Sequence, residues 1–158
     1  MSEQGTFKTM PNWCNNTLQI TGSEADIRKF KKQAKARGTA LSLAKFYPEP
    51  DYTKVKVKPT FPSIKKVKYV EPSEAWWDWR VQNWGTKWDI DAELIAEDES
   101  YLEYEFDSAW SPPISWLKKV AKDFPELQFI LKYDECGMCF RGVATAKKGK
   151  VYDQCIQY

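Results

Sequence analysis

Apolar and polar residues alternate in several stretches of the chain, which is the pattern of half-buried β-strands. In the stretch 15–21, Leu18 and Ile20 alternate with Thr17, Gln19 and Thr21. A hairpin is predicted from 88–96 and 101–107, joined by the polar tip 97–100. Further strands are expected at 127–133, 140–146 and 151–156, and the last two of these are expected to pair around Lys147-Lys148-Gly149.

Three helices are predicted between these strands, each from an apolar stripe and a capping signal. Ser23 with Asp26 forms a capping box, and the first helix ends at Arg37-Gly38. A second helix begins at Pro72 and ends at Gly85. Its expected apolar stripe is Trp77, Val81 and Trp84.

The third helix is expected to begin with Ser111 as N-cap and Pro112 at the first helical position. Its apolar face is Leu117, Val120, Ala121 and Phe124, and Pro125 ends it. Between the first two helices, the stretch 46–72 contains five prolines, so no helix is expected there and it is predicted to be a long insertion.

The predicted order, strand–helix–insertion–helix–strand–strand–helix–strand, matches the split-βαβ, ferredoxin-like fold with a C-terminal hairpin added. The expected class is therefore α+β, with an antiparallel sheet and helices on one face. One domain is expected over 10–158, and the polar stretch 1–9 before Met10 is expected to be an N-terminal extension, a tag or an upstream start.

Composition bears on the cellular location and on the state of the cysteines. No apolar run approaches the length of a membrane helix and no secretory signal is evident, so a cytoplasmic location is expected. The four cysteines are then expected to be free thiols. Cys136 and Cys139 have the spacing of a metal knuckle, but a zinc site would also need Cys14 and Cys155, because the chain has no histidine. No cofactor is predicted.

The absence of histidine also excludes imidazole-dependent catalysis. No phosphate-binding glycine loop is present. Pairs of carboxylates leave a metal-dependent hydrolase as a minor alternative, but their alternating placement is typical of a surface. A non-enzymatic binding protein is therefore expected.

Four sequence blocks, taken together, resemble a known family. They are PNWCNNTLQITG (11–22), WWDWRVQNWGTKWD (76–89), FDSAWSPP (106–113) and YDECGMCFRG (133–142). The chain resembles the phage- and plasmid-encoded YubB-type family with a ferredoxin-like domain. The resemblance implies that fold and an origin as a mobile-element accessory gene, located in the host bacterial cell, but it implies no activity and no site residue. Family members usually begin at the position of Met10 and lack the cysteines seen at 136 and 139. The blocks also have a purely structural interpretation, as helix stops, caps and core aromatics.

The net charge is only +2, but the charges are segregated along the chain. The stretch 88–117 holds nine acids and no Lys or Arg. Because alternate residues of a strand share a face, six carboxylates are expected on one surface of the sheet. These are Asp89, Asp91, Glu93, Glu103, Glu105 and Asp107.

Three interpretations of this row remain open: a solvated surface, a surface neutralised by the chain's own lysines, and a contact for a host protein with a basic surface. The third is the leading functional hypothesis, with inhibition of a host defence system as its expected consequence, because a regular acidic surface can imitate a nucleic-acid backbone.

The stretch 52–70 holds six lysines and no acid. They are Lys54, Lys56, Lys58, Lys65, Lys66 and Lys68. Residues 54–58 alternate as an edge strand would. This lysine segment is interpreted either as a solvated loop or, with its flanking aromatic residues, as a nucleic-acid-binding patch, which is the alternative function. The partner's identity and the oligomeric state do not follow from the sequence.

Overall fold

The computed structural model describes residues 11–158; the predicted extension 1–9 lies outside this range. Within it, six strands form one antiparallel sheet in the order β2-β3-β1-β4-β5-β6. The strands are β1 (Trp13–Thr21), β2 (Ala92–Asp98), β3 (Tyr101–Ala109), β4 (Gln128–Glu135), β5 (Phe140–Lys147) and β6 (Lys150–Gln157). The helices are α1 (Glu24–Ala34), a 3₁₀ turn η1 (Leu43–Lys45), α2 (Pro62–Lys65), α3 (Ala75–Asn83) and α4 (Ile114–Asp123).

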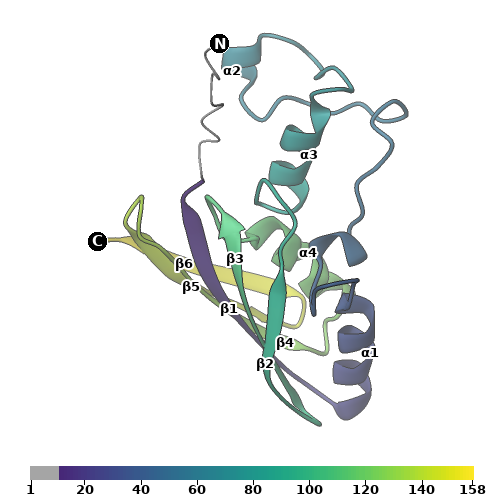
Figure 1. Ribbon diagram of the computed structural model, residues 1–158, viewed down its shortest axis with the longest axis vertical. Coiled ribbons are helices and arrows are strands. Elements are labelled where there is room, and N and C mark those ends of the chain that lie inside the picture. The colour runs from purple at the N-terminus through teal and green to yellow at the C-terminus, as the bar shows by residue number, and fades with distance from the viewer. Residues whose placement is uncertain (1–10) are drawn as a thin grey trace, which may run out of the picture.

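The first four strands, with the two helices α1 and α4 that cross between them, have the ferredoxin-like arrangement that the sequence predicted. Both helices lie on the same face of the sheet (Figure 1). The hairpin β5–β6 extends the sheet beyond β4, as expected from the turn at Lys147–Lys150. One face of the sheet is therefore covered by helices, and we call the other the open face.

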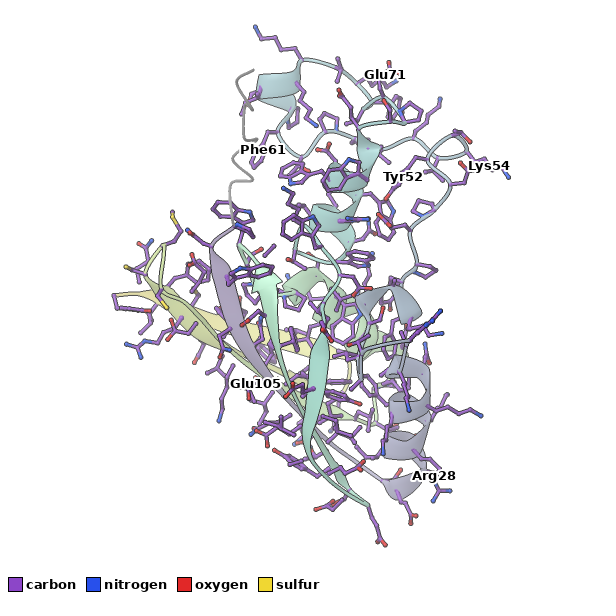
Figure 2. All side chains as sticks on the ribbon, in the orientation of Figure 1. Arg28, Tyr52, Lys54, Phe61, Glu71 and Glu105 are labelled. Atoms are coloured by element: carbon purple, nitrogen blue, oxygen red, sulfur yellow. The ribbon has the colours of Figure 1, made fainter. Side chains whose placement is uncertain are left out.

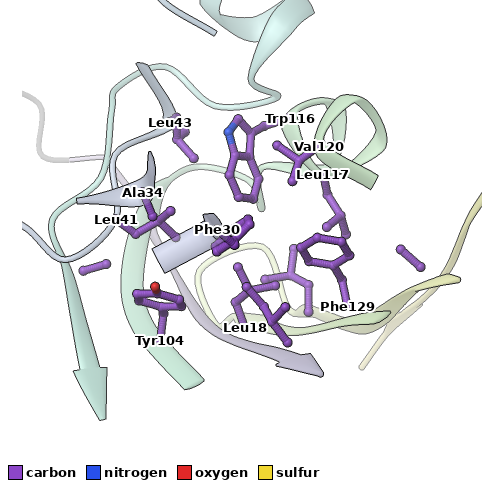
Figure 3. Close-up of a cluster of buried hydrophobic side chains, with 14 of the residues drawn as sticks. Leu18, Phe30, Ala34, Leu41, Leu43, Tyr104, Trp116, Leu117, Val120 and Phe129 are labelled. Carbon is purple, nitrogen blue, oxygen red and sulfur yellow. The ribbon is translucent and has the colours of Figure 1, made fainter. Parts of the chain in front are cut away.

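The covered face carries the main core. Leu18 at the centre of β1 lies between Tyr104 of β3 and Leu131 of β4. Phe30 of α1 packs over this row (Figure 3). Its ring makes edge contacts with those of Phe124 and Phe129 at ring-centroid distances of 5.5 and 5.8 Å. All six side chains are buried, and each contributes about 1.5–3 kcal/mol through removal of apolar surface from water.

The helix boundaries correct three details of the prediction. Ser23 caps α1 as expected and accepts a hydrogen bond from the Asp26 N–H, but the helix ends at Ala34, three residues early. Helix α4 begins at Ile114, and Ser111 is not its cap, because its hydroxyl donates to the Gly85 carbonyl instead.

The buried face of α3 also differs from the predicted tryptophan stripe. Ala75 and Asp78 are its buried residues, whereas Trp77 and Val81 are only partly buried. Trp84 is buried, but as the C-cap, where Gly85 with a φ of 84° ends the helix.

The insertion 46–72 extends from the top of the molecule together with α3 (Figure 1). It contains one helical turn, α2, which Pro62 can begin because proline's missing N–H is not needed at the first position; the prediction of no helix there was wrong. Residues 54–58 form no strand. A small cluster of Val57, Val70 and Ala75, separate from the main core, holds the insertion to α3.

The two borders of the sheet differ. At the β2 border, Ala40 N–H donates to the Ala92 carbonyl at 3.0 Å, and the Thr39 hydroxyl accepts from Ala92 N–H at 2.8 Å. A bulge in β2 follows between Leu94 and Ala96. At the β6 border, no residue within 11–158 pairs with the outer side of the strand.

Candidate functional site

The open face of strands β2 and β3 gathers most of the predicted acidic residues. Glu93 of β2 lies directly opposite Glu105 of β3. Glu103, Glu105 and Asp107 alternate along β3 with the buried side chains of Leu102, Tyr104 and Phe106. Asp91 is exposed between buried Ile90 and Ala92. We call Asp91, Glu93, Glu103, Glu105 and Asp107 the acidic face.

These carboxylates form no ion pair with a described residue, although Lys132 of β4 lies on the same face, beyond Thr17, which separates it from Glu105. None of the ion pairs among residues 11–158 involves the acidic face. Asp107 accepts a hydrogen bond from the Asn15 amide at 3.2 Å, and Glu103 accepts one from the Tyr101 hydroxyl. Glu93 and Glu105 are exposed, and their opposed carboxylates repel each other in the folded protein.

Asp89 does not belong to this face, contrary to the prediction. Strand β2 begins only at Ala92, so the strand alternation does not extend back to Asp89. Its carboxylate accepts hydrogen bonds from the Ser42 hydroxyl at 2.6 Å and from the Leu43 N–H at 2.7 Å. Asp89 thus caps η1 and ties it to the start of β2.

The bulge decides where the later acids of β2 point. Ile95 is the additional residue, so Glu97 lies opposite Leu102 and faces the helices. There Glu97 pairs with Lys31 of α1 at 2.5 Å. Because of the bulge, Ala96 rather than an acid lies opposite Glu103.

The lysine segment does not cover the acidic face, so the interpretation of internal neutralisation was wrong. Lys54 lies in the insertion at the upper end of the molecule, whereas Glu105 lies well below it on the sheet (Figure 2). Lys65 instead pairs with the buried carboxylate of Asp78 at 2.6 Å. Lys56 and Lys68 both lie over the ring of Tyr69, at 5.2 and 5.5 Å. Lys58 and Lys66 are exposed.

An exposed pair of tryptophans adjoins the acidic face, and sequence reasoning missed it. Trp13 occupies the same side of β1 as Asn15, next to Asp107, and its ring lies 6.0 Å from that of Trp88. The two are 45% and 36% exposed, and Lys87 Nζ lies 4.8 Å from the Trp88 ring. The only signal in the sequence was the position of Trp13 in the strand alternation. It falls on the same face as Asn15 and Thr17, opposite to that of Leu18 and Ile20.

The cysteines do not assemble into a four-thiolate site. Cys136 and Cys139 are exposed in the turn between β4 and β5, while Cys14 is buried in the sheet, where burial raises its pKa to about 12. Within 11–158 no group of three or more Cys, Asp or Glu side chains is placed to hold a metal ion. The same residues include no helix long and apolar enough to cross a membrane.

The four sequence blocks meet at one end of the sheet and build its scaffold. The Asn16 amide donates to the Ser108 hydroxyl at 2.8 Å, and Ser108 donates to the Ser111 carbonyl at 2.7 Å. Ser111 in turn reaches Gly85, which links the blocks that begin at 11, 76 and 106. In the fourth block, the buried Glu135 accepts hydrogen bonds from the backbone N–H groups of residues 137 and 138, at 2.7 and 3.0 Å.

Fold and surface together define an α+β protein with a ferredoxin-like domain, an added hairpin and an acidic open face. Residues 83–158 match the family model described as the ferredoxin-like domain in Api92-like protein. The whole structure is similar to the crystal structure of protein api92 from Yersinia pseudotuberculosis, with a TM-score of 0.59 and 12% identity, over 94% of this chain and 98% of that one. At this identity the likeness establishes the fold. No curated protein matches the sequence.

Proposed function

We propose that the protein is a non-enzymatic binding protein whose acidic face docks on a basic surface of a partner protein. The observation that carries the proposal is the opposition of Glu93 and Glu105 on an open sheet surface, where neither carboxylate forms an ion pair with any residue of 11–158. A bound cationic surface would relieve this repulsion, so the acids that disfavour folding favour association.

The exposed tryptophans support a protein as the partner. Aromatic side chains at the border of a charged surface are typical anchors of protein interfaces, where a few residues supply most of the binding energy. Trp13 and Trp88 provide such an anchor beside Asp107, whereas a purely solvated surface would not need them.

The resemblance to mobile-element proteins extends the proposal to origin and role. A cytoplasmic accessory protein of a phage or plasmid would benefit from occupying the basic groove of a host defence nuclease. Carboxylates at strand spacing supply the negative charge that such a groove attracts.

The proposal is tested by capture of partners from a bacterial lysate, followed by binding measurements with the purified partner. The triple variant E93Q/E105Q/D107N should lose capture, and binding by the wild type should weaken steeply with salt. The control E71Q/E74Q/E126Q removes the same charge from exposed acids elsewhere and should bind as the wild type does. Equal loss in both variants, or none in the first, would refute the acidic-face mechanism.

The lysine segment supports nucleic-acid binding as the alternative function. Lys56, Lys58, Lys66 and Lys68 have no acidic partner within 11–158, and Phe61 nearby is 52% exposed. A gel shift with single-stranded DNA or RNA at two salt concentrations separates the two hypotheses. The alternative requires a shift that weakens with salt and that K58Q/K66Q abolishes, whereas docking through the acidic face predicts no shift.

A further inference from the structure

Strand β6 presents an unprotected border of the sheet. Its eight residues pair with β5 without a register shift, so no bulge twists the edge away. It contains no proline, and its only lysine is the first residue. Tyr152 and Ile156 are 68% and 60% exposed. A long, regular and partly apolar edge of this kind is a template for another strand.

The opposite border has the protection that β6 lacks. Segment 39–40 bonds to β2 at Ala92, a bulge interrupts the strand, and the strand itself carries Glu93, Glu97 and Asp98. The contrast within one sheet indicates that β6 is the side open to association.

The ladder with β5 shows which groups of β6 are free. Tyr158 N–H donates to the Cys139 carbonyl, so the even-numbered residues direct their backbone groups toward β5. The odd-numbered residues therefore direct theirs outward. These are Val151, Asp153, Cys155 and Gln157.

We propose that β6 pairs with β6 of a second copy of this chain, antiparallel and centred on Gln154. A two-fold axis perpendicular to the sheet keeps both open faces on the same side. Even-numbered residues of β6 must then lie opposite even-numbered residues of the second copy, and odd-numbered opposite odd-numbered. With this centre, Tyr152 of each copy lies opposite Ile156 of the other, and Lys150 lies opposite Tyr158. Asp153 lies opposite Cys155, and their outward backbone groups form hydrogen-bonded pairs.

This register is self-complementary, which favours a second copy over an unrelated strand. It covers the two most exposed apolar side chains of β6 with each other, and no like charges oppose. A centre at Asp153 would place two carboxylates face to face. A centre at Cys155 would leave Ile156 opposite Gln154. The pairing lies at the border away from the acidic face, so it goes beyond the proposed function and does not depend on it.

The assembly is tested first by light scattering with size-exclusion chromatography. We expect a mass of about twice 18.5 kDa for the wild type, rising toward that value over about a hundredfold range of concentration. The variant Y152K/I156K should remain at the mass of one chain. The control I64K/V67K changes two exposed apolar residues of the insertion and should associate as the wild type does. A wild type that stays monomeric over the whole range, or a control that dissociates like the edge variant, would overturn the proposal.

Cross-linking tests the register, in a background where Cys136, Cys139 and Cys155 are serine. At Q154C, the two new thiols face each other across a non-hydrogen-bonded pair with Cα atoms about 4.5 Å apart, which suits a disulfide. Oxidised glutathione should therefore convert Q154C to a covalent dimer. T145C, exposed on the neighbouring strand β5, should stay monomeric. Equal cross-linking of the two, or none at Q154C, would contradict the register.

Discussion

Single polar side chains at the motif-bearing end of the sheet hold segments that lie far apart in sequence. The Ser108 hydroxyl accepts from Asn16 and donates to the Ser111 carbonyl, so one buried group satisfies two others. A net hydrogen bond of this type contributes about 1 kcal/mol, and leaving its partner unpaired costs more. The motif residues are explained by this role in the scaffold.

On the open face, the paired acids are expected to lower the stability of the free protein. Changing Glu105 to Gln removes the repulsion with Glu93, so the free energy of unfolding should rise by about 0.5 kcal/mol at low salt. Urea denaturation at two salt concentrations measures this, and the gain should shrink as salt screens the pair. The free energy of unfolding of the control E126Q, a change at an exposed acid after α4, should differ little from that of the wild type. An E105Q variant less stable than the wild type would contradict the proposed repulsion between Glu93 and Glu105.

Strand alternation was sufficient to predict the positions of Glu93, Glu103, Glu105 and Asp107. It failed for Asp89, because alternation holds only inside a strand and β2 begins three residues later. No local pattern indicates that a carboxylate will cap a 3₁₀ turn 46 positions earlier in the chain.

Among the elements, the insertion depends on one buried charge. Asp78 of α3 is fully buried and accepts from the Thr60 N–H at 2.7 Å as well as from Lys65. Burial acts to raise the pKa of Asp78, but the hydrogen bonds from Lys65 and Thr60 outweigh it and hold the pKa below the ordinary value of 3.8. The ionised carboxylate thus fixes the insertion to α3.

The variant D78N is expected to lose about 3 kcal/mol of stability at neutral pH, because it leaves Lys65 without its counter-charge. Since the folded-state pKa is depressed, the stabilisation by Asp78 is complete above about pH 4 and is lost as the pH falls through the folded-state pKa. The difference between wild type and D78N should therefore shrink in acid. Thermal melts between neutral and acidic pH test this, and a difference independent of pH would exclude the ion pair as its cause.

The bulge in β2 leads to an unusual expectation for a deletion. Removing Ile95 would join Leu94 to Ala96 and restore a regular ladder with the present partners Tyr104 and Glu103. The deletion should thus fold, with a stability change within about 1 kcal/mol. Removing Glu105 from β3 should abolish folding, because it moves the remaining side chains to the wrong face. Circular dichroism and thermal melts distinguish the two, and equal loss would show that the bulge is required.

Element types were predictable because strand and helix periods are marked along the chain, and the antiparallel hairpin turns follow from local residues. The starts of the helices were harder to predict. Ser111 and Pro112 are residue types that typically begin a helix, but the Ser111 hydroxyl bonds to Gly85 and α4 begins at Ile114. The helical turn at Pro62 was missed because proline density argues only against helix interiors.

At the scale of the whole molecule, the structure has a main core between sheet and helices and a small cluster in the insertion. Backbone amides of β1, which is paired on both sides, should exchange slowest in hydrogen exchange, and those of 52–70 fastest. D78N should accelerate exchange in the insertion while leaving β1 nearly unchanged. Uniform exchange across both regions would instead show that they unfold together.

The arrangement of the sheet could be predicted from element order, since the ferredoxin-like order leaves few unknotted topologies. The position of the lysine segment could not, because nothing local specifies the direction in which a proline-rich insertion leaves the domain. That direction rests on distant contacts such as Lys65 with Asp78.

The unequal borders of the sheet also limit how far self-association can proceed. Because segment 39–40 bonds to Ala92 and a bulge interrupts β2, a molecule joined through β6 has no second long and regular edge to offer. Growth must then stop at a closed pair, and the added strand contact carries no route to fibres. Each β6 can pair with one further strand only. The mass should therefore stay at that of two chains even at high protein concentration.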